Sequence, residues 1–146
     1  MTAAERPRFH LAFAVHDLGV ARRFYVDLLG CATGRESKGW IDVDFHGHQL
    51  TAHLAQRPPA PEARSVDGDA VPVRHFGLIL PAAEWGALAE RLKQSGVKFL
   101  IAPRVRFKGR PGEQSTLFLR DPSGNALEFK SFRDEAAIFA VDPGVS

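Results

Sequence analysis

The sequence predicts an α+β fold made from two copies of one unit, and three repeated features predict it. Each half of the chain opens with a histidine at the head of an apolar stretch, His10 in the first half and His75 in the second. A helix-like segment that ends in glycine follows in each half. Each half then contains an Asp-x-x-Gly-x-x-Leu sequence, at residues 44–50 and 121–127. Two βαβββ modules account for all three features.

The first module, about residues 8–55, opens with a predicted strand at residues 9–15, which are short and mostly apolar. Asp17 is placed to cap a helix, because its carboxylate can accept from the free N–H groups of the first turn. Gly30 ends that helix, since glycine takes the left-handed conformation at little cost. A second strand is expected at residues 32–37.

Two further strands complete the first module. In residues 39–45, apolar residues alternate with Asp42 and Asp44, which is the pattern of a half-buried strand. Gly47 then turns the chain into the last strand, at residues 48–54.

Residues 56–73 contain four prolines and little periodicity, which predicts a linker. The second module, about residues 74–132, repeats the order of the first. Its expected elements are a strand at 75–80, a helix at 82–95, strands at 97–107, 115–120 and 126–132, and a short helical turn at 134–139 within the C-terminal tail, 133–146.

Length and composition favour one compact domain. The chain has 146 residues, 45% hydrophobic and 25% charged, which is ordinary for a globular protein. A net charge of +2 is too small to predict binding to nucleic acid. The single Cys31 excludes an intramolecular disulfide and fits a reducing compartment. No apolar run is long enough to cross a bilayer, so we expect a cytoplasmic protein with neither nucleic acid nor membrane as its partner.

Two motifs suggest a family. ARRFYVDLLG at residues 21–30 and DPSGNALEF at residues 121–129, together with the histidine-led modules, resemble the vicinal oxygen chelate superfamily. This superfamily includes glyoxalase I, fosfomycin- and bleomycin-resistance proteins, methylmalonyl-CoA epimerase and extradiol dioxygenases. The resemblance covers about residues 8–132. It implies a curled mixed sheet, or half-barrel, with the helices outside, and a homodimer.

The resemblance also implies a metal site. It places ligand positions at His10, Thr51, His75 and Glu128, of which Thr51 alone is not a typical ligand. Strand alternation points Glu128 away from its apolar neighbours, and a buried carboxylate there needs a cation or a donor. Two imidazoles and one carboxylate form the set typical of non-haem Fe(II). We therefore expect His10, His75 and Glu128 to bind a divalent metal, Fe(II) in preference to Mn, Zn, Ni or Co.

The ligand number favours one chemistry within the superfamily. Glyoxalase-like and epimerase-like members usually supply a fourth side chain at the place of Thr51, whereas extradiol dioxygenases use three ligands. His53 lies two residues beyond Thr51 and projects from the same face. Three interpretations of His53 are open: a catalytic acid/base near bound oxygen, a metal ligand in a shifted register, or a hydrogen-bonded structural residue.

One position departs from the dioxygenase pattern. Ring-cleaving members usually have a tyrosine ten residues before the glutamate, where this chain has Phe118. A phenyl ring can pack against a substrate but donates no hydrogen bond. Phe118, Thr51 and Gln49 are therefore the expected substrate contacts, and His46 and His48 are further candidate donors.

The sequence thus predicts an extradiol-type oxygenase that acts on a small substrate with two oxygens able to chelate a metal. Two alternatives stay open. One is a glyoxalase-like isomerase or lyase, or a thiol transferase, that uses a Lewis-acid metal. The other is a metal-free ligand-binding protein of the resistance type.

A late basic cluster has two interpretations. It consists of Arg104, Arg106, Lys108 and Arg110. The cluster steers an anionic substrate, or it protects an edge strand from pairing with another chain. The second interpretation is the commoner one for such a pattern.

Overall fold

The structure is a computed structural model that describes residue 2 and residues 5–141. It divides into two compact units, Met1–Pro59 with Asp121–Gly124, and Ala60–Arg120 with Asn125–Ser146. Each unit contains one four-stranded sheet. The predicted α+β class with paired βαβββ modules is confirmed.

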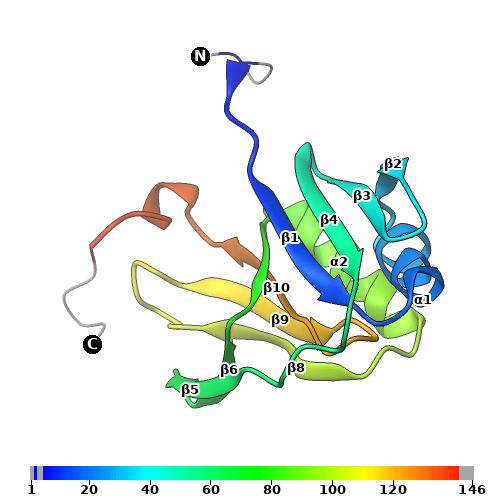
Figure 1. The fold of residues 1–146 in the computed structure, drawn as a ribbon. Coiled ribbons are helices and arrows are strands. Elements are labelled where there is room, and N and C mark those ends of the chain that lie inside the picture. The colour runs from blue at the N-terminus through cyan, green and yellow to red at the C-terminus, as the bar shows by residue number, and fades with distance from the viewer. Residues whose placement is uncertain (1, 3–4, 142–146) are drawn as a thin grey trace. The chain divides into compact units, whose positions relative to one another are not determined.

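The sheet of the first unit is mixed and has the order β1-β4-β3-β2. Strand β1 runs parallel to β4, while the β4–β3 and β3–β2 pairs are antiparallel, as Figure 1 shows. The bounds are His10–Val15 for β1, Ala32–Glu36 for β2, Trp40–Phe45 for β3 and His48–Leu54 for β4. All four strands occur where the sequence predicts them.

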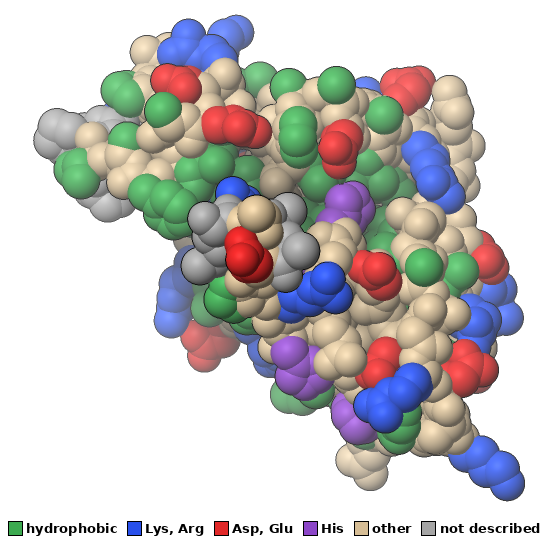
Figure 2. Space-filling view, turned by 90° about the horizontal axis from the view of Figure 1, so that it is seen from above, with side chains coloured by type: hydrophobic (Ala, Val, Ile, Leu, Met, Phe, Trp, Pro, Cys, Tyr) green, Lys and Arg blue, Asp and Glu red, His purple; other side chains and the backbone are tan. Residues whose placement is uncertain are grey.

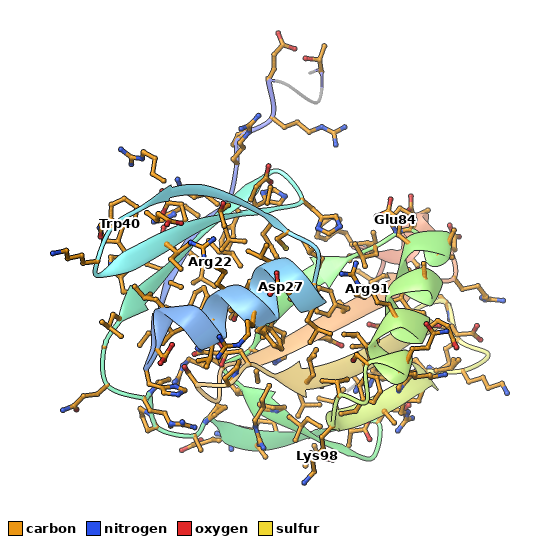
Figure 3. The ribbon with its side chains drawn as sticks, turned by 90° about the vertical axis from the view of Figure 1, so that its right-hand side faces the viewer. Arg22, Asp27, Trp40, Glu84, Arg91 and Lys98 are labelled. Carbon is orange, nitrogen blue, oxygen red and sulfur yellow. The ribbon has the colours of Figure 1, made fainter. Side chains whose placement is uncertain are left out.

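The helix of the first unit begins as predicted and then changes geometry. Asp17 caps α1 (Leu18–Arg22) by accepting from the Val20 N–H at 3.0 Å. The segment continues as a π-helix, η2 (Arg23–Leu28), and Figure 3 shows Arg22 and Asp27 on this continuous coil. Tyr25 is fully buried, and its hydroxyl donates to Asp121 Oδ2 at 2.8 Å. The helical segment is thereby tied to the Asp121–Gly124 turn of the same unit.

The sheet of the second unit repeats the first, with the order β7-β10-β9-β8 and a parallel β7–β10 pair. The bounds are Phe76–Ile79 for β7, Phe99–Arg106 for β8, Gln114–Arg120 for β9 and Ala126–Phe132 for β10. Helix α2 (Ala82–Gln94) packs on β10, where the Trp85 Nε1–H donates to the Phe129 carbonyl at 2.8 Å. Figure 3 labels Glu84 and Arg91 on this helix.

The predicted linker contains structure that the sequence analysis missed. Strands β5 (Glu62–Val66) and β6 (Asp69–Val73) form an antiparallel hairpin. Its two turn residues, Asp67 and Gly68, have φ of 43° and 83°. Positive φ at both positions is the requirement of a type I′ turn, for which Asp-Gly is a favoured pair. The linker prediction rested on the four prolines of the segment and did not take this turn pair into account.

The C-terminal tail contains the predicted helical turn, as the 3-10 helix η3 (Glu135–Ala137). Among the described residues, no helix is long and apolar enough to cross a membrane. On the face in Figure 2, acidic and basic side chains are interspersed.

Candidate functional site

The second unit brings two of the predicted metal ligands together. His75 directly precedes β7, Glu128 lies on β10, and His75 Nε2 is 3.3 Å from Glu128 Oε1. The parallel pairing of the strands sets Gly77 beside Glu128. A Cβ at Gly77 would lie 1.5 Å from the Glu128 carbonyl oxygen. Glycine is therefore needed for the close approach of these two strands.

A backbone carbonyl fixes the proton of the His75 ring. His75 Nδ1 lies 2.6 Å from the Pro72 oxygen, and because a carbonyl only accepts, Nδ1 is the donor. In a neutral ring, Nε2 then presents its lone pair to the Glu128 carboxylate. Two acceptors at this separation require a proton or a cation between them. Metal-bound histidines commonly donate their other ring N–H to a carbonyl in this way.

The other oxygen of Glu128 is held by neighbouring strands. Thr116 Oγ1 on β9 donates to Glu128 Oε2 at 2.5 Å, and Arg106 Nη1 on β8 is 3.5 Å from the same oxygen. The Glu128 side chain is 7% exposed and that of Arg106 is 5% exposed. Glu128 is therefore oriented with Oε1 toward His75.

The pair also shows opposite pKa shifts. The hydrogen bond to Glu128 raises the pKa of His75 above its ordinary value, although burial opposes the shift. Burial raises the pKa of Glu128, but the hydrogen bonds from His75 and Thr116, together with the charges of Lys130 and His75, leave this pKa below its ordinary value. Each group thus favours the charged form of the other.

Phe118 packs against this pair. Its ring is fully buried and meets the His75 ring edge-on, with centroids 4.9 Å apart. The Arg106 guanidinium carbon lies 5.8 Å from its centroid. These contacts help to fix His75 and Arg106, and a contact of Phe118 with substrate stays a prediction.

His10, Gln49, Thr51 and His53 lie in the first unit and share one face of its sheet. The β1–β4 register pairs His10 with Gln49, Ala12 with Thr51, and Ala14 with His53. His10 and Gln49 line a cavity of about 470 Å³ together with His48. This volume is in the range of small-molecule sites.

A carboxylate that the sequence analysis missed lies on the same face. Asp42 on β3 is paired directly across from Thr51, whose hydroxyl donates to Asp42 Oδ1 at 2.7 Å. Asp42 is only 6% exposed and also lines the cavity. The alternation over residues 39–45 predicts the face of the strand on which Asp42 lies, whereas only the β3–β4 register shows that Thr51 is its partner.

His53 lies far from His10 along the strand. His53 is exposed, and it is four residues beyond Gln49, the partner of His10. At about 3.3 Å per residue, that separation is about 13 Å. The distance argues against direct proton transfer between His53 and a substrate bound beside His10, so the acid/base role stays a prediction.

Two arginines of the basic cluster pair with a carboxylate, and both interpretations of the cluster stay predictions. Strand β8 is at the edge of its sheet, but Arg106 on it is buried. Arg104 and Arg106 each donate to Asp69 Oδ2 at 3.0 Å. These two arginines are therefore paired within the second unit.

Comparison with known proteins identifies the family. The model of the glyoxalase/bleomycin resistance protein/dioxygenase superfamily matches residues 9–129. The chain belongs to this superfamily. A solved structure of a glyoxalase/bleomycin resistance protein/dioxygenase from Alicyclobacillus acidocaldarius is 37% identical to this chain. The match covers 91% of this chain and 96% of the other, and the two structures superpose with a TM-score of 0.76.

More distant matches carry different names. Virulence protein STM3117 of Salmonella typhimurium is 23% identical over 84% of this chain and 82% of its own length. The fosfomycin resistance protein FosX of Listeria monocytogenes is 16% identical, with 91% and 98% coverage and a TM-score of 0.66. These matches show the fold, and the superfamily alone does not select one reaction.

Superfamily members typically bind divalent metals, and the second unit fits such an ion. Two ligand atoms that are each about 2.1 Å from one ion can be about 3 Å apart. The Nε2–Oε1 separation of 3.3 Å is close to this value. No group of three or more His, Cys, Asp or Glu side chains arranged to hold a metal occurs within the described residues. His75 and Glu128 are therefore a candidate two-ligand half-site, and metal binding by these residues and by His10 stays a prediction.

Proposed function

We propose that this protein is a divalent-metal-dependent enzyme that binds a small substrate through two neighbouring oxygens, and that it catalyses an oxygenation of the extradiol type. The observation that carries the proposal is the His75–Glu128 pair. Its two facing acceptor atoms, 3.3 Å apart, are oriented by Pro72 and Thr116 and need a cation or a proton between them.

In this proposal His10, His75 and Glu128 hold the ion, with Fe(II) favoured. When bound, the ion supplies a centre at which a chelated substrate and oxygen can exchange electrons. Thr116 donates to Glu128 Oε2, so the carboxylate offers Oε1 to the ion. The Pro72 carbonyl keeps Nε2 of His75 free of its proton in the neutral ring.

Two groups of the first sheet are candidates to move the substrate proton. The strand partner of His10 is Gln49, and Thr51 lies two residues beyond Gln49 on β4. Asp42 is paired across from Thr51, whereas His53 lies two residues beyond Thr51. Asp42 is therefore nearer to His10 than His53 is. Loss of turnover in Asp42→Asn, with turnover retained in His53→Gln, would support Asp42 as the proton acceptor.

A second candidate function is Lewis-acid chemistry with Zn, Ni, Co or Mn, such as glyoxalase-type isomerisation or thiol transfer. Phe118, which is paired with Glu128, favours this Lewis-acid function, because its ring has no hydroxyl with which to bind a catecholate. The site residues would be the same, and oxygen would not be a substrate.

Oxygen consumption separates these functions. Protein purified without oxygen and loaded with Fe(II) is expected to consume O2 with at least one member of a panel of catechols and hydroxylated aromatic acids. Turnover that is unchanged by removal of oxygen would favour the Lewis-acid function. Failure of Fe(II), Mn(II) and Zn(II) to raise thermal stability would instead favour a metal-free binding protein.

A further inference from the structure

Arg106 is shared unequally between two carboxylates. Its Nη2 donates to Asp69 Oδ2 at 3.0 Å, whereas its Nη1 is 3.5 Å from Glu128 Oε2. The first distance is an ordinary charge-assisted hydrogen bond, and the second is at the outer limit. Its Nε is buried and donates to no atom of the described residues. The guanidinium is thus held nearer to Asp69 than to Glu128.

This sharing affects what Glu128 can bind. A guanidinium that formed a two-point pair with Glu128 would neutralise the carboxylate and compete with a divalent ion for it. Asp69 provides a second anion that holds the guanidinium at a distance. Glu128 keeps Oε1 directed at His75 in this arrangement.

Asp69 belongs to the β5–β6 hairpin, which two aspartates attach to β8. Asp69 binds both Arg104 and Arg106. Asp67 binds Arg104 Nη2 at 3.0 Å and accepts from the Phe107 N–H at 3.1 Å. Both aspartates hold the hairpin, but of these two only Asp69 forms an ion pair with Arg106.

From this geometry we infer that Asp69 is a positioning residue for the metal half-site: by drawing Arg106 toward the hairpin, it leaves Glu128 available to a divalent cation. The inference rests on the proposed metal function and extends it to the β5–β6 hairpin. Replacing Asp69 by a neutral residue would let Arg106 close on Glu128, and the affinity for the cation would fall.

The test is a calorimetric titration of Mn(II) into metal-free protein. Asp69→Asn is expected to weaken binding by about tenfold, the lower end of the range for residues that orient metal ligands. Asp67→Asn, which loosens the hairpin without touching Arg106, is the matched control and should stay within about twofold. Arg106→Gln leaves Asp69 intact and should bind Mn(II) at least as tightly as wild type, because the competing cation is gone.

The double variant shows whether Asp69 acts through Arg106. In the Arg106→Gln background, Asp69→Asn should weaken binding by about threefold or less, since no guanidinium remains to move. An equal loss in both backgrounds, or equal affinities of Asp69→Asn and Asp67→Asn, would overturn the inference while leaving the proposed function intact. A wild-type protein that binds no Mn(II), Fe(II) or Zn(II) would contradict the proposed function, and the inference would fall with it.

Discussion

At the scale of single residues, the facing atoms of His75 and Glu128 make the metal-free protein sensitive to pH. The raised pKa of His75 adds stability that is complete below its unfolded value, near 6.5, and is lost as pH rises through the folded value. The lowered pKa of Glu128 adds stability above its unfolded value, near 4.5, which is lost as pH falls through the folded value. The pair therefore stabilises the fold most between these two values.

This pH dependence can be measured by urea unfolding in the presence of a chelator. The difference in unfolding free energy between wild type and His75→Gln should be greatest between pH 4.5 and 6.5. It should shrink on either side of that range. A difference that stays constant from acidic to alkaline pH would contradict the proposed charge pairing.

The sequence predicts only part of the site at this scale. His75 and Glu128 could be predicted because the repeat and strand alternation each single them out. The contacts of Asp42, Thr116 and Arg106 could not be predicted. Each is made with a residue on another strand, and only the pairing of the strands brings the two residues together. The predicted role of His53 rests on its face of the strand and on the family resemblance, and neither takes account of its distance along the strand from His10.

At the scale of elements, the β7–β10 pair depends on Gly77. An alanine methyl at this position would overlap the Glu128 carbonyl, so Gly77→Ala must separate the strands that carry His75 and Glu128. We predict a loss of at least about 2 kcal/mol in unfolding free energy, together with weaker metal binding.

The matched control for this prediction is Gly86→Ala on α2, where an added Cβ meets no atom within 4 Å. This variant should be neutral or slightly more stable, because alanine favours helix more than glycine does. Equal thermal stability of the two variants would contradict the role of Gly77.

The elements themselves were largely predictable. Strand alternation, the Asp17 cap and the stop at Gly30 gave bounds close to those observed. The β5–β6 hairpin was not predicted, because the prolines of residues 56–73 favour a linker, whereas the Asp67–Gly68 pair favours a hairpin turn. The π-helical geometry of η2 has no marker in residue periodicity, and nothing in the structure gives its physical cause.

At the scale of the whole molecule, the duplication explains the sheet order. Both sheets place their first strand beside their last, in parallel, so each module carries the head of its first strand next to its closing strand. The second module has Glu128 on its closing strand, while the first has Thr51 there with Asp42 across from it. The two copies thus share a framework and differ in chemistry.

A homodimer stays a prediction from the family resemblance. Sedimentation velocity should give a mass twice that of the chain at micromolar concentration. A mass equal to that of one chain would contradict it and would leave the proposed metal chemistry unchanged.

We propose that His10, His75 and Glu128 hold one divalent ion. This proposal can be tested by elemental analysis of anaerobically purified wild type, His10→Ala, Glu128→Ala and a control variant at an exposed residue of α2, Glu90→Ala. We predict about one ion per chain in wild type and the control, and loss of the ion in the other two variants. Retention of the ion by either variant, or its absence from wild type reconstituted with Fe(II), Mn(II) or Zn(II), would contradict this three-ligand site.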